Sequence, residues 1–192
     1  MTAIEARPTV EPGPRVWPVS IRAYHALGEL GLIPEKTELL YGQVFHKMPK
    51  SPLHRLLAMR LLELLRRLLP SGLHVQQEQP ILCNDSEPEP DLSVIRGSIE
   101  DYATEHPATA ELVIEVCVTS HEYDRSKLRA YAGAGVKEVW LVLAPEKQIE
   151  VHREPAGEIF RERVVHGPGG RLGSAAAPEF AVELEAVFAS NQ

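Results

Sequence analysis

The sequence contains no long hydrophobic run and very little cysteine. Its 192 residues include two cysteines, Cys83 and Cys117, with no CxxC pair and no cysteine–histidine spacing typical of zinc sites. Both lie in apolar, strand-like segments, and we interpret them as buried, reduced thiols. No stretch of about eighteen apolar residues is present, so we expect no membrane-spanning helix. The first eighteen residues lack the basic and apolar regions of a secretory signal, and we therefore expect a cytoplasmic protein.

Basic residues are also in the minority. Twenty lysines and arginines stand against 27 aspartates and glutamates, which gives a formal net charge of −7 at neutral pH. This balance argues against a protein that coats nucleic acid through its overall charge, but a basic groove on an acidic body remains compatible with it. Apolar residues at 44% and charged residues at 24% are ordinary values for a globular protein. The length is that of one domain with a substantial core.

Several familiar catalytic signatures are missing. The chain has no GxSxG motif and no P-loop lysine, which argues against serine hydrolases and P-loop enzymes. Its eight histidines show no HxH or HExxH spacing. The acidic run NDSEPEPD lacks the central glycine and the final glutamate of an EF-hand. The segment GAGVKE ends a predicted helix, so it does not open a nucleotide-binding loop.

The hydrophobic pattern predicts a domain that mixes helices and strands. Residues 1–18 are proline-rich, and we expect a flexible N-terminal arm there, followed by one domain over residues 19–192. Predicted helices cover 21–30, 51–69, 122–135 and a short segment at 183–190. Predicted strands cover 37–48 (a pair that bends near Gly42), 73–83, 91–96, 111–118, 137–144 and a hairpin over 148–165. This order predicts an α/β (α+β) fold with a mixed central β-sheet flanked by helices.

Three polar residues stand out against this pattern. Asp91 follows Pro90 at the start of a predicted strand, and Glu115 lies inside the apolar run LVIEVCV. A carboxylate in such a run is costly unless a cation balances it. Lys127 follows on the next predicted helix. Adjacent strands can place Asp91 and Glu115 side by side, and a helix packed on the sheet can direct a lysine toward them.

Such an arrangement suits Mg²⁺-assisted hydrolysis of a phosphodiester bond. Two carboxylates hold Mg²⁺ while it keeps several waters, and the metal lowers the pKa of a bound water. A nearby lysine can position or deprotonate that water, or stabilise the charged transition state. The spacing alone is not specific, because acidic strand ends and helix lysines are usually solvated.

Several blocks of the chain resemble the Uma2 family, which is also catalogued as a domain of unknown function and as candidate restriction endonucleases. The blocks are ELLYGQVFHKMPKSPLH, EQPILCNDSEPEPD, EPEPDLSVIR, LVIEVCVTSHEYDRSKLRAYAGAGVKEVWLV and IEVHRE. They occur in the family's order between about Ser20 and Phe188. The resemblance implies a restriction-endonuclease-like fold of the PD-(D/E)xK class.

The resemblance also implies roles for individual residues. Asp91 and Glu115 match the family's acidic pair, and Lys127 matches its lysine, whereas the usual E-x-K position is Cys117. The implied catalytic residues are therefore Asp91, Glu115 and Lys127. The implied metal ligands are Asp91, Glu115, Glu38 and the carbonyl of Val116. The supporting residues are His54, Asp124 and Tyr131, and Tyr123 also falls on a family position.

Asp124 and Tyr131 lie about one helical turn on either side of Lys127, so we expect both to orient its ammonium group. Val118 and Leu143 depart from the family pattern, which tends to have a polar or acidic residue and an aspartate there. We interpret the departure at Leu143 as structural. Whether the site is fully active with Val118 and Cys117 in place is not determined by the sequence.

The function implied by the resemblance is Mg²⁺-dependent endonuclease activity, with Mn²⁺ as a possible substitute and DNA as the expected substrate. A homodimer is expected because a double-strand cut needs two sites. The alternative is a catalytically weak binding or accessory module that acts through a protein or nucleic-acid partner. RNA is not distinguished from DNA. Four arginines of the helix predicted over 51–69, namely Arg55, Arg60, Arg66 and Arg67, either line a nucleic-acid groove or lie on a solvated face.

Overall fold

A six-stranded sheet forms the centre of the computed structural model, which describes residues 16–119, 121–175 and 181–189. The strands lie in the order β3-β4-β5-β6-β7-β8, and only β5 and β6 run parallel. Their bounds are Leu73–Gln77 (β3), Leu92–Arg96 (β4), Leu112–Cys117 (β5), Glu138–Leu143 (β6), Gln148–Ala156 (β7) and Ile159–His166 (β8). The predicted mixed central sheet and fold class are confirmed.

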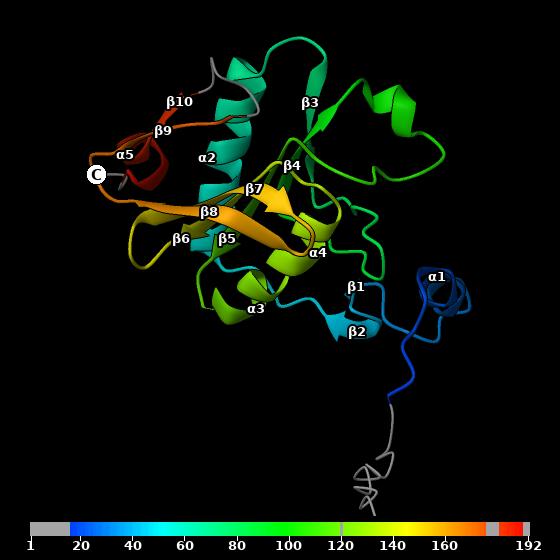
Figure 1. Ribbon diagram of the computed structural model, residues 1–192. Coiled ribbons are helices and arrows are strands. Elements are labelled where there is room, and N and C mark those ends of the chain that lie inside the picture. The colour runs from blue at the N-terminus through cyan, green and yellow to red at the C-terminus, as the bar shows by residue number, and fades with distance from the viewer. Residues whose placement is uncertain (1–15, 120, 176–180, 190–192) are drawn as a thin grey trace, which may run out of the picture.

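Helices cover both faces of this sheet (Figure 1). The helix α2, Pro52–Leu68, packs on one face, and α4, Leu128–Gly133, packs on the other. A parallel strand pair requires a long crossover connection, and α3, His121–Ser126, together with α4 provides it between β5 and β6. The strand β5 is therefore covered on both sides, which explains its almost continuous apolar sequence.

Side chains of β5 alternate between these two layers, as the period of a strand requires. Ile114 and Val116 belong to the cluster beneath α2, whereas Val113 and Cys117 belong to the cluster beneath α4. By the same alternation, Glu115 points to the α4 side. A carboxylate in the middle of this strand thus faces the layer in which the crossover helices lie.

The start of α2 is well defined by its sequence. The Ser51 side chain accepts a hydrogen bond from the His54 amide at 3.2 Å, and Pro52 occupies the first turn. One face of the helix is buried through Leu57, Ala58, Leu61, Leu62 and Leu65. These leucines recur at the helical spacing on which the prediction over 51–69 depended.

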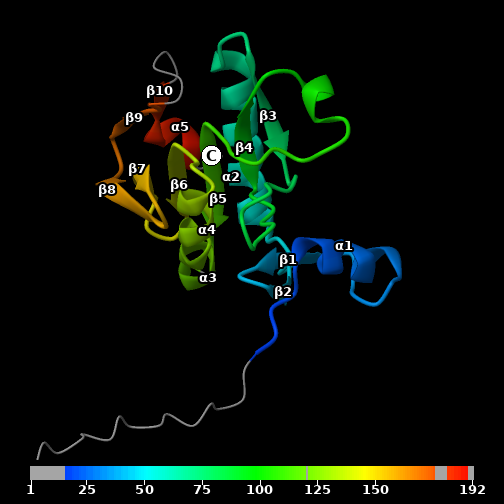
Figure 2. The ribbon, with the colours of Figure 1, turned by 45° about the vertical axis from the view of Figure 1, so that its right-hand side comes forward.

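The helix α1, Ile21–Glu29, and a hairpin of β1, Thr37–Leu40, and β2, Gln43–His46, lie together at one end of the molecule (Figure 2). Tyr41 and Gly42 form the two-residue turn of the hairpin with φ angles of 53° and 71°. A Cβ atom at Gly42 would lie 2.5 Å from the Cβ of Pro18, so glycine is required there. This hairpin carries Glu38 toward the sheet.

Two predicted elements differ from the structure. The strand predicted over 73–83 ends at Gln77, because the backbone turns at Glu78, which has a φ angle of 53°. The Glu78 amide still donates to the carbonyl of Asp91, which is the last bond in the register of β3 and β4. The helix predicted over 122–135 is two helices, α3 and α4. The amide of Lys127 bonds the carbonyl of Asp124, three residues earlier, which tightens the turn and separates them.

Three small elements complete the described part of the chain. The 3₁₀ helix η1, Ile99–Tyr102, and the pair β9, Arg171–Gly173, and β10, Ala181–Glu183, were not predicted. The terminal helix α5, Leu184–Phe188, lies inside the segment predicted to be helical. Residues 1–15 of the predicted arm lie outside the described residues, so the division into arm and single domain stays a prediction. None of the helices in the described ranges is long and apolar enough to cross a membrane.

We expect Leu61→Ala to lower the free energy of unfolding by about 2–5 kcal/mol, because it would leave a cavity between α2 and the sheet. Leu61 is 0% exposed, whereas Leu53 on the same helix is 45% exposed. Leu53→Ala is the matched control and should change the free energy by less than about 0.5 kcal/mol. Urea unfolding followed by circular dichroism measures both values. Equal losses in the two variants would contradict this packing.

Candidate active site

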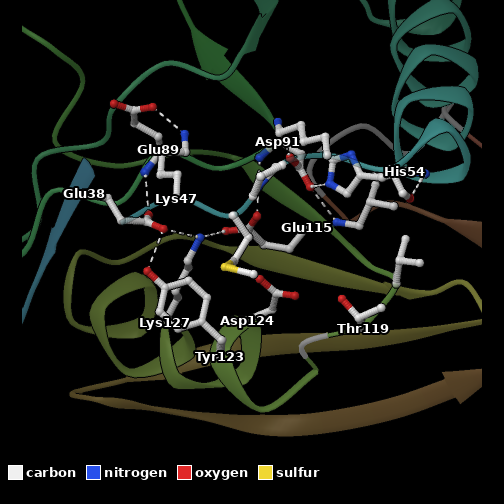
Figure 3. A pocket seen from close by; sticks show the side chains of 16 residues that line it. Glu38, Lys47, His54, Glu89, Asp91, Glu115, Thr119, Tyr123, Asp124 and Lys127 are labelled. Atoms are coloured by element: carbon white, nitrogen blue, oxygen red, sulfur yellow. Dashed lines mark hydrogen bonds and ion pairs between the residues drawn. The ribbon is translucent and has the colours of Figure 1, made fainter. Parts of the chain in front are cut away.

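A cavity of about 120 Å³ opens where the β1–β2 hairpin, the start of α2, the adjoining ends of β4 and β5, and α3 meet. Figure 3 shows Glu38 and Glu115 directed at the ammonium of Lys127, with His54 beside Asp91. Five carboxylates and three lysines line the cavity, namely Glu38, Glu89, Asp91, Glu115, Asp124, Lys47, Lys50 and Lys127. The structure thus brings the predicted catalytic residues together in one pocket.

Asp91 and Glu115 lie side by side because of the antiparallel register of β4 and β5. Leu92 is paired with Ile114, which places Asp91 opposite Glu115. The Asp91 amide donates a hydrogen bond to Glu115 Oε2 at 3.4 Å. The Val116 amide donates to Asp91 Oδ2 at 2.8 Å. Both carboxylates are buried, with residue exposures of 7% for Asp91 and 3% for Glu115.

Two basic side chains keep Asp91 ionised. His54 Nε2 lies 2.9 Å from Asp91 Oδ2, and Lys50 Nζ lies 2.8 Å from Asp91 Oδ1. Burial by itself raises the pKa of Asp91, but the hydrogen bond and charge of His54, followed by Lys50, outweigh burial and lower the pKa to about 2. His54, predicted as a supporting residue, therefore orients and stabilises the Asp91 carboxylate.

Lys127 bridges the other two buried carboxylates. Its Nζ lies 3.2 Å from Glu115 Oε1 and 3.1 Å from Glu38 Oε1. Burial works against the charge of this side chain, but the carboxylates of Glu115 and then Glu38 outweigh it and raise the pKa of Lys127 above its usual value. The side chain therefore stays protonated and acts as a fixed positive charge.

The pKa of Glu115 is shifted in the opposite direction to that of Asp91. Burial raises the pKa of Glu115 to about 8, with a further contribution from Asp91, while Lys127 opposes the shift. Glu115 and Asp91 are thus adjacent carboxylates with widely separated pKa values. Without a metal ion, Glu115 binds a proton over much of the neutral pH range.

Two tyrosines orient the carboxylates that hold Lys127. The Tyr131 hydroxyl donates to Glu115 Oε1 at 2.6 Å, and the Tyr123 hydroxyl donates to Glu38 Oε1 at 2.8 Å. The Tyr123 ring also lies 5.2 Å from the Lys127 ammonium. Tyr131 therefore acts on Lys127 through Glu115, whereas the sequence suggested a direct role.

Asp124 lines the same pocket at the start of the crossover. Burial raises the pKa of Asp124, and the charge of Lys127 and a hydrogen bond with Cys117 oppose that shift. Cys117 itself is fully buried, and Val118 is partly buried at the rim of the pocket. Leu143, the other departure from the family pattern, is buried in the core.

Sequence reasoning missed Lys50. Its ammonium contacts Asp91 and also Glu78, whose Oε1 lies 2.9 Å away. Lys50 directly precedes Ser51, the N-cap of α2, where the helix dipole disfavours a positive charge. A lysine in that position was the available signal that a carboxylate from elsewhere in the fold balances it.

The donor atoms of the pocket fit a hard divalent cation. Within the described ranges, no three aspartate, glutamate, histidine or cysteine side chains form a ready-made metal cage. Mg²⁺ needs no such cage, since it is commonly held by one or two carboxylates, water and substrate phosphate. With every carboxylate ionised and His54 neutral, the five carboxylates and three lysines carry an excess of two negative charges, which falls to one when Glu115 holds a proton. The adjacent pair Asp91 and Glu115 offers the required oxygens.

The backbone of Val116 is placed to add an oxygen to this pair. Its amide is directed to Asp91, and in a strand the amide and carbonyl of one residue point to the same side. Glu38 lies across Lys127 from Glu115, so the lysine stands between it and the pair. Asp91, Glu115 and Val116 are thus close together, and Glu38 is more distant.

Comparisons with known proteins agree with this architecture. The family model of Uma2, described as "Putative restriction endonuclease", matches residues 27–185. A crystal structure described as a "putative nuclease belonging to DUF820 from Anabaena variabilis ATCC 29413" superposes with a TM-score of 0.72 at 18% identity. The match covers 84% of this chain and 96% of that chain, and at this identity it shows a common fold. No curated protein sequence matches this chain significantly.

In the absence of metal, we expect the free energy of unfolding to fall as pH rises from about 5 to about 8. The pKa of Glu115 in the folded state, about 8, lies above its ordinary value of 4.5, so the folded protein binds more protons in this window than the unfolded chain. The contribution reaches about 1.4 kcal/mol per pH unit at most. Asp91, with its lowered pKa, loses its contribution only in more acidic solution.

Urea unfolding in EDTA at several pH values measures this dependence. Glu115→Gln should flatten the slope, whereas Glu100→Gln, at an exposed position in η1, should leave it unchanged. A slope in Glu115→Gln equal to that of the unchanged protein would contradict the assignment.

Proposed function

Because the chain belongs to the Uma2 family, we propose that it is a Mg²⁺-dependent endonuclease that hydrolyses phosphodiester bonds in DNA. The observation that carries this proposal is the adjacent pair of buried carboxylates, Asp91 and Glu115, in a pocket lined by five carboxylates and three lysines. Such a pair calls for a cation. Mn²⁺ is expected to replace Mg²⁺, since both prefer carboxylate, carbonyl and water oxygens.

Asp91, Glu115 and the Val116 carbonyl would hold the metal ion, and Glu38 would assist through water. When bound, the ion would supply neutralisation of the phosphate charge and a water of lowered pKa. Asp91 is already ionised in the folded protein, because His54 and Lys50 stabilise its charge. Glu115 would release its proton as the metal binds, so metal affinity should increase with pH.

Lys127 would contribute to the reaction through its positive charge. Its ammonium is held between Glu38 and Glu115 and stays protonated, so it is unsuited to accept a proton from water. A fixed ammonium beside the phosphate stabilises the negative charge that develops at phosphorus and can position the attacking water. Tyr123 and Tyr131 fix the two glutamates and thereby the position of this charge.

Two further features belong to the proposal. A cut through both strands needs two active sites, and one domain of this size presents one, so we infer a homodimer as the acting form. The competing function is a binding or accessory module of low activity. It is favoured by Lys50 and Lys127, which pair with the pocket carboxylates, and by the apolar Val118 that lines the pocket.

The decisive experiment is cleavage of supercoiled plasmid, single-stranded DNA and RNA with Mg²⁺ or Mn²⁺. We expect DNA cleavage that requires metal and falls about 100-fold or more in Asp91→Asn and in Lys127→Ala, because each removes charge from the reacting centre. Lys36→Ala, at an exposed position near β1, is the control and should cut normally. Circular dichroism verifies folding, since Lys127→Ala leaves two buried carboxylates without their cation.

The other outcomes separate the alternatives. Equal cutting by all variants indicates a contaminating nuclease. Absence of cutting, together with a rise in melting temperature on Mn²⁺ addition that Asp91→Asn lacks, supports the binding module. Cleavage of RNA without cleavage of DNA would support the metal site but contradict the proposal that DNA is the substrate.

A further inference from the structure

A second hollow of about 380 Å³ adjoins the catalytic pocket along α2. The two share the lining residues Lys50, Ser51 and His54, so they adjoin at the first turn of this helix. The catalytic pocket has only about one third of this volume. A polymeric substrate must therefore extend beyond the catalytic pocket, and the second hollow can hold the adjoining part of the substrate strand.

The walls of this hollow differ in chemistry. Pro52, Ala58 and Met59 give α2 an apolar wall, while Gln77 and Glu78 at the end of β3 form the opposite, polar wall. Met59 is 37% exposed although it is a large apolar side chain. Both walls belong to elements that pack against each other, so the hollow is held open by the fold. We call it the α2 groove.

Arg55 also lines this groove, and its side chain is exposed. Within the described ranges, that side chain has no hydrogen bond or ion pair. Several other arginines are paired with acidic residues, for example Arg96 with Glu111 and Arg153 with Glu138. The neighbouring cation, Lys50, is already held by Asp91 and Glu78. Arg55 is thus a cation beside the active site that is available to an anionic ligand.

Other hollows in the described part of the protein lack this relation to the active site. The hollow between α1 and the segment at Thr104–His106 shares no lining residue with the catalytic pocket, and neither does the one beside Arg129. Lining residues shared with the active site, an apolar wall and an arginine side chain with no partner among the described residues coincide in the α2 groove. Together they match a nucleotide, which has a flat base and a phosphate.

We propose that the α2 groove binds the nucleotide next to the scissile phosphate of the substrate strand. Arg55 contacts the phosphate of that nucleotide, and Met59 and Pro52 contact its base. The inference rests on the proposed nuclease function and names the path of the substrate away from the metal. Because an apolar wall reads no hydrogen-bond pattern, we expect weak preference among bases at this position.

The test compares Arg55→Ala and Met59→Ala with Arg67→Ala. Arg67 is an exposed arginine on the last turn of the same helix, outside the groove, and its side chain too has no hydrogen bond or ion pair with the described residues. Binding of a fluorescent single-stranded oligonucleotide is measured by anisotropy in Ca²⁺ over a range of salt concentrations. Affinity for Mn²⁺ is measured by calorimetry for each variant.

We expect Arg55→Ala to weaken oligonucleotide binding about 10-fold, as the loss of a charge-assisted hydrogen bond predicts. Its salt dependence should decrease by about 0.7 in the log–log slope, the value for one phosphate contact on a single strand. Met59→Ala should weaken binding without changing that slope, because its contact is apolar. Mn²⁺ affinity should be the same in all three variants, since none of these residues holds the metal.

The results distinguish this inference from the proposed function. Binding and salt slopes in Arg55→Ala equal to those of Arg67→Ala would overturn the groove assignment even if the protein cuts DNA normally. Loss of binding in Arg55→Ala supports the groove even if the unchanged protein fails to cut, which would contradict only the nuclease. Absence of oligonucleotide binding by the unchanged protein overturns the assignment as well.

Discussion

The ion group formed by Lys127, Glu115 and Glu38 is the interaction on which the rest of the site depends. It joins β1 to β5 and the junction of α3 and α4, which lie much later in the chain. Burial penalises the charge of each of these three side chains, and the ion pairs between them offset that cost. The tight turn at Lys127, which divides the crossover into two helices, places the lysine where both carboxylates reach it. The pairing thus ties the β1–β2 hairpin to the sheet and shapes one side of the active-site pocket.

A second charge arrangement on the α2 side gives the site its chemical asymmetry. His54 and Lys50 hold Asp91 in its ionised form, whereas burial favours a proton on Glu115. Two adjacent carboxylates with separated pKa values avoid the repulsion of a doubly charged pair until a cation arrives. Because the start of α2 supplies His54 and continues into the α2 groove, one helix both stabilises the first carboxylate and borders the proposed path of the substrate. Catalysis and substrate position would then be coupled through a rigid element.

Much of the fold was predictable because its signals are local. The leucine spacing and Ser51 cap of α2, the apolar run of β5 and the turn at Gly42 each indicate their element from a few neighbouring residues. The short extent of β3 was not predictable, because it depends on a positive φ angle at Glu78, a residue type that does not itself signal such a turn. The division at Lys127 likewise conflicts with a helical sequence pattern, and the ion pairs with Glu38 and Glu115 outweigh local preference there.

For the candidate site, the sequence by itself determined which carboxylates are unusual. Asp91 after Pro90 and Glu115 in an apolar strand are anomalies that burial makes costly. Lys127 on the next helix was a candidate for their cation, and the resemblance to Uma2 added Glu38. Only the tertiary structure decided how their charges are balanced. The role of Lys50, the tyrosine contacts to the glutamates, and the groove at Arg55 depend on residues that meet only when α2, β3 and the crossover pack together. Electrostatic and hydrogen-bond energies depend on distances of a few ångströms between such groups, and the order of residues along a chain does not specify those distances.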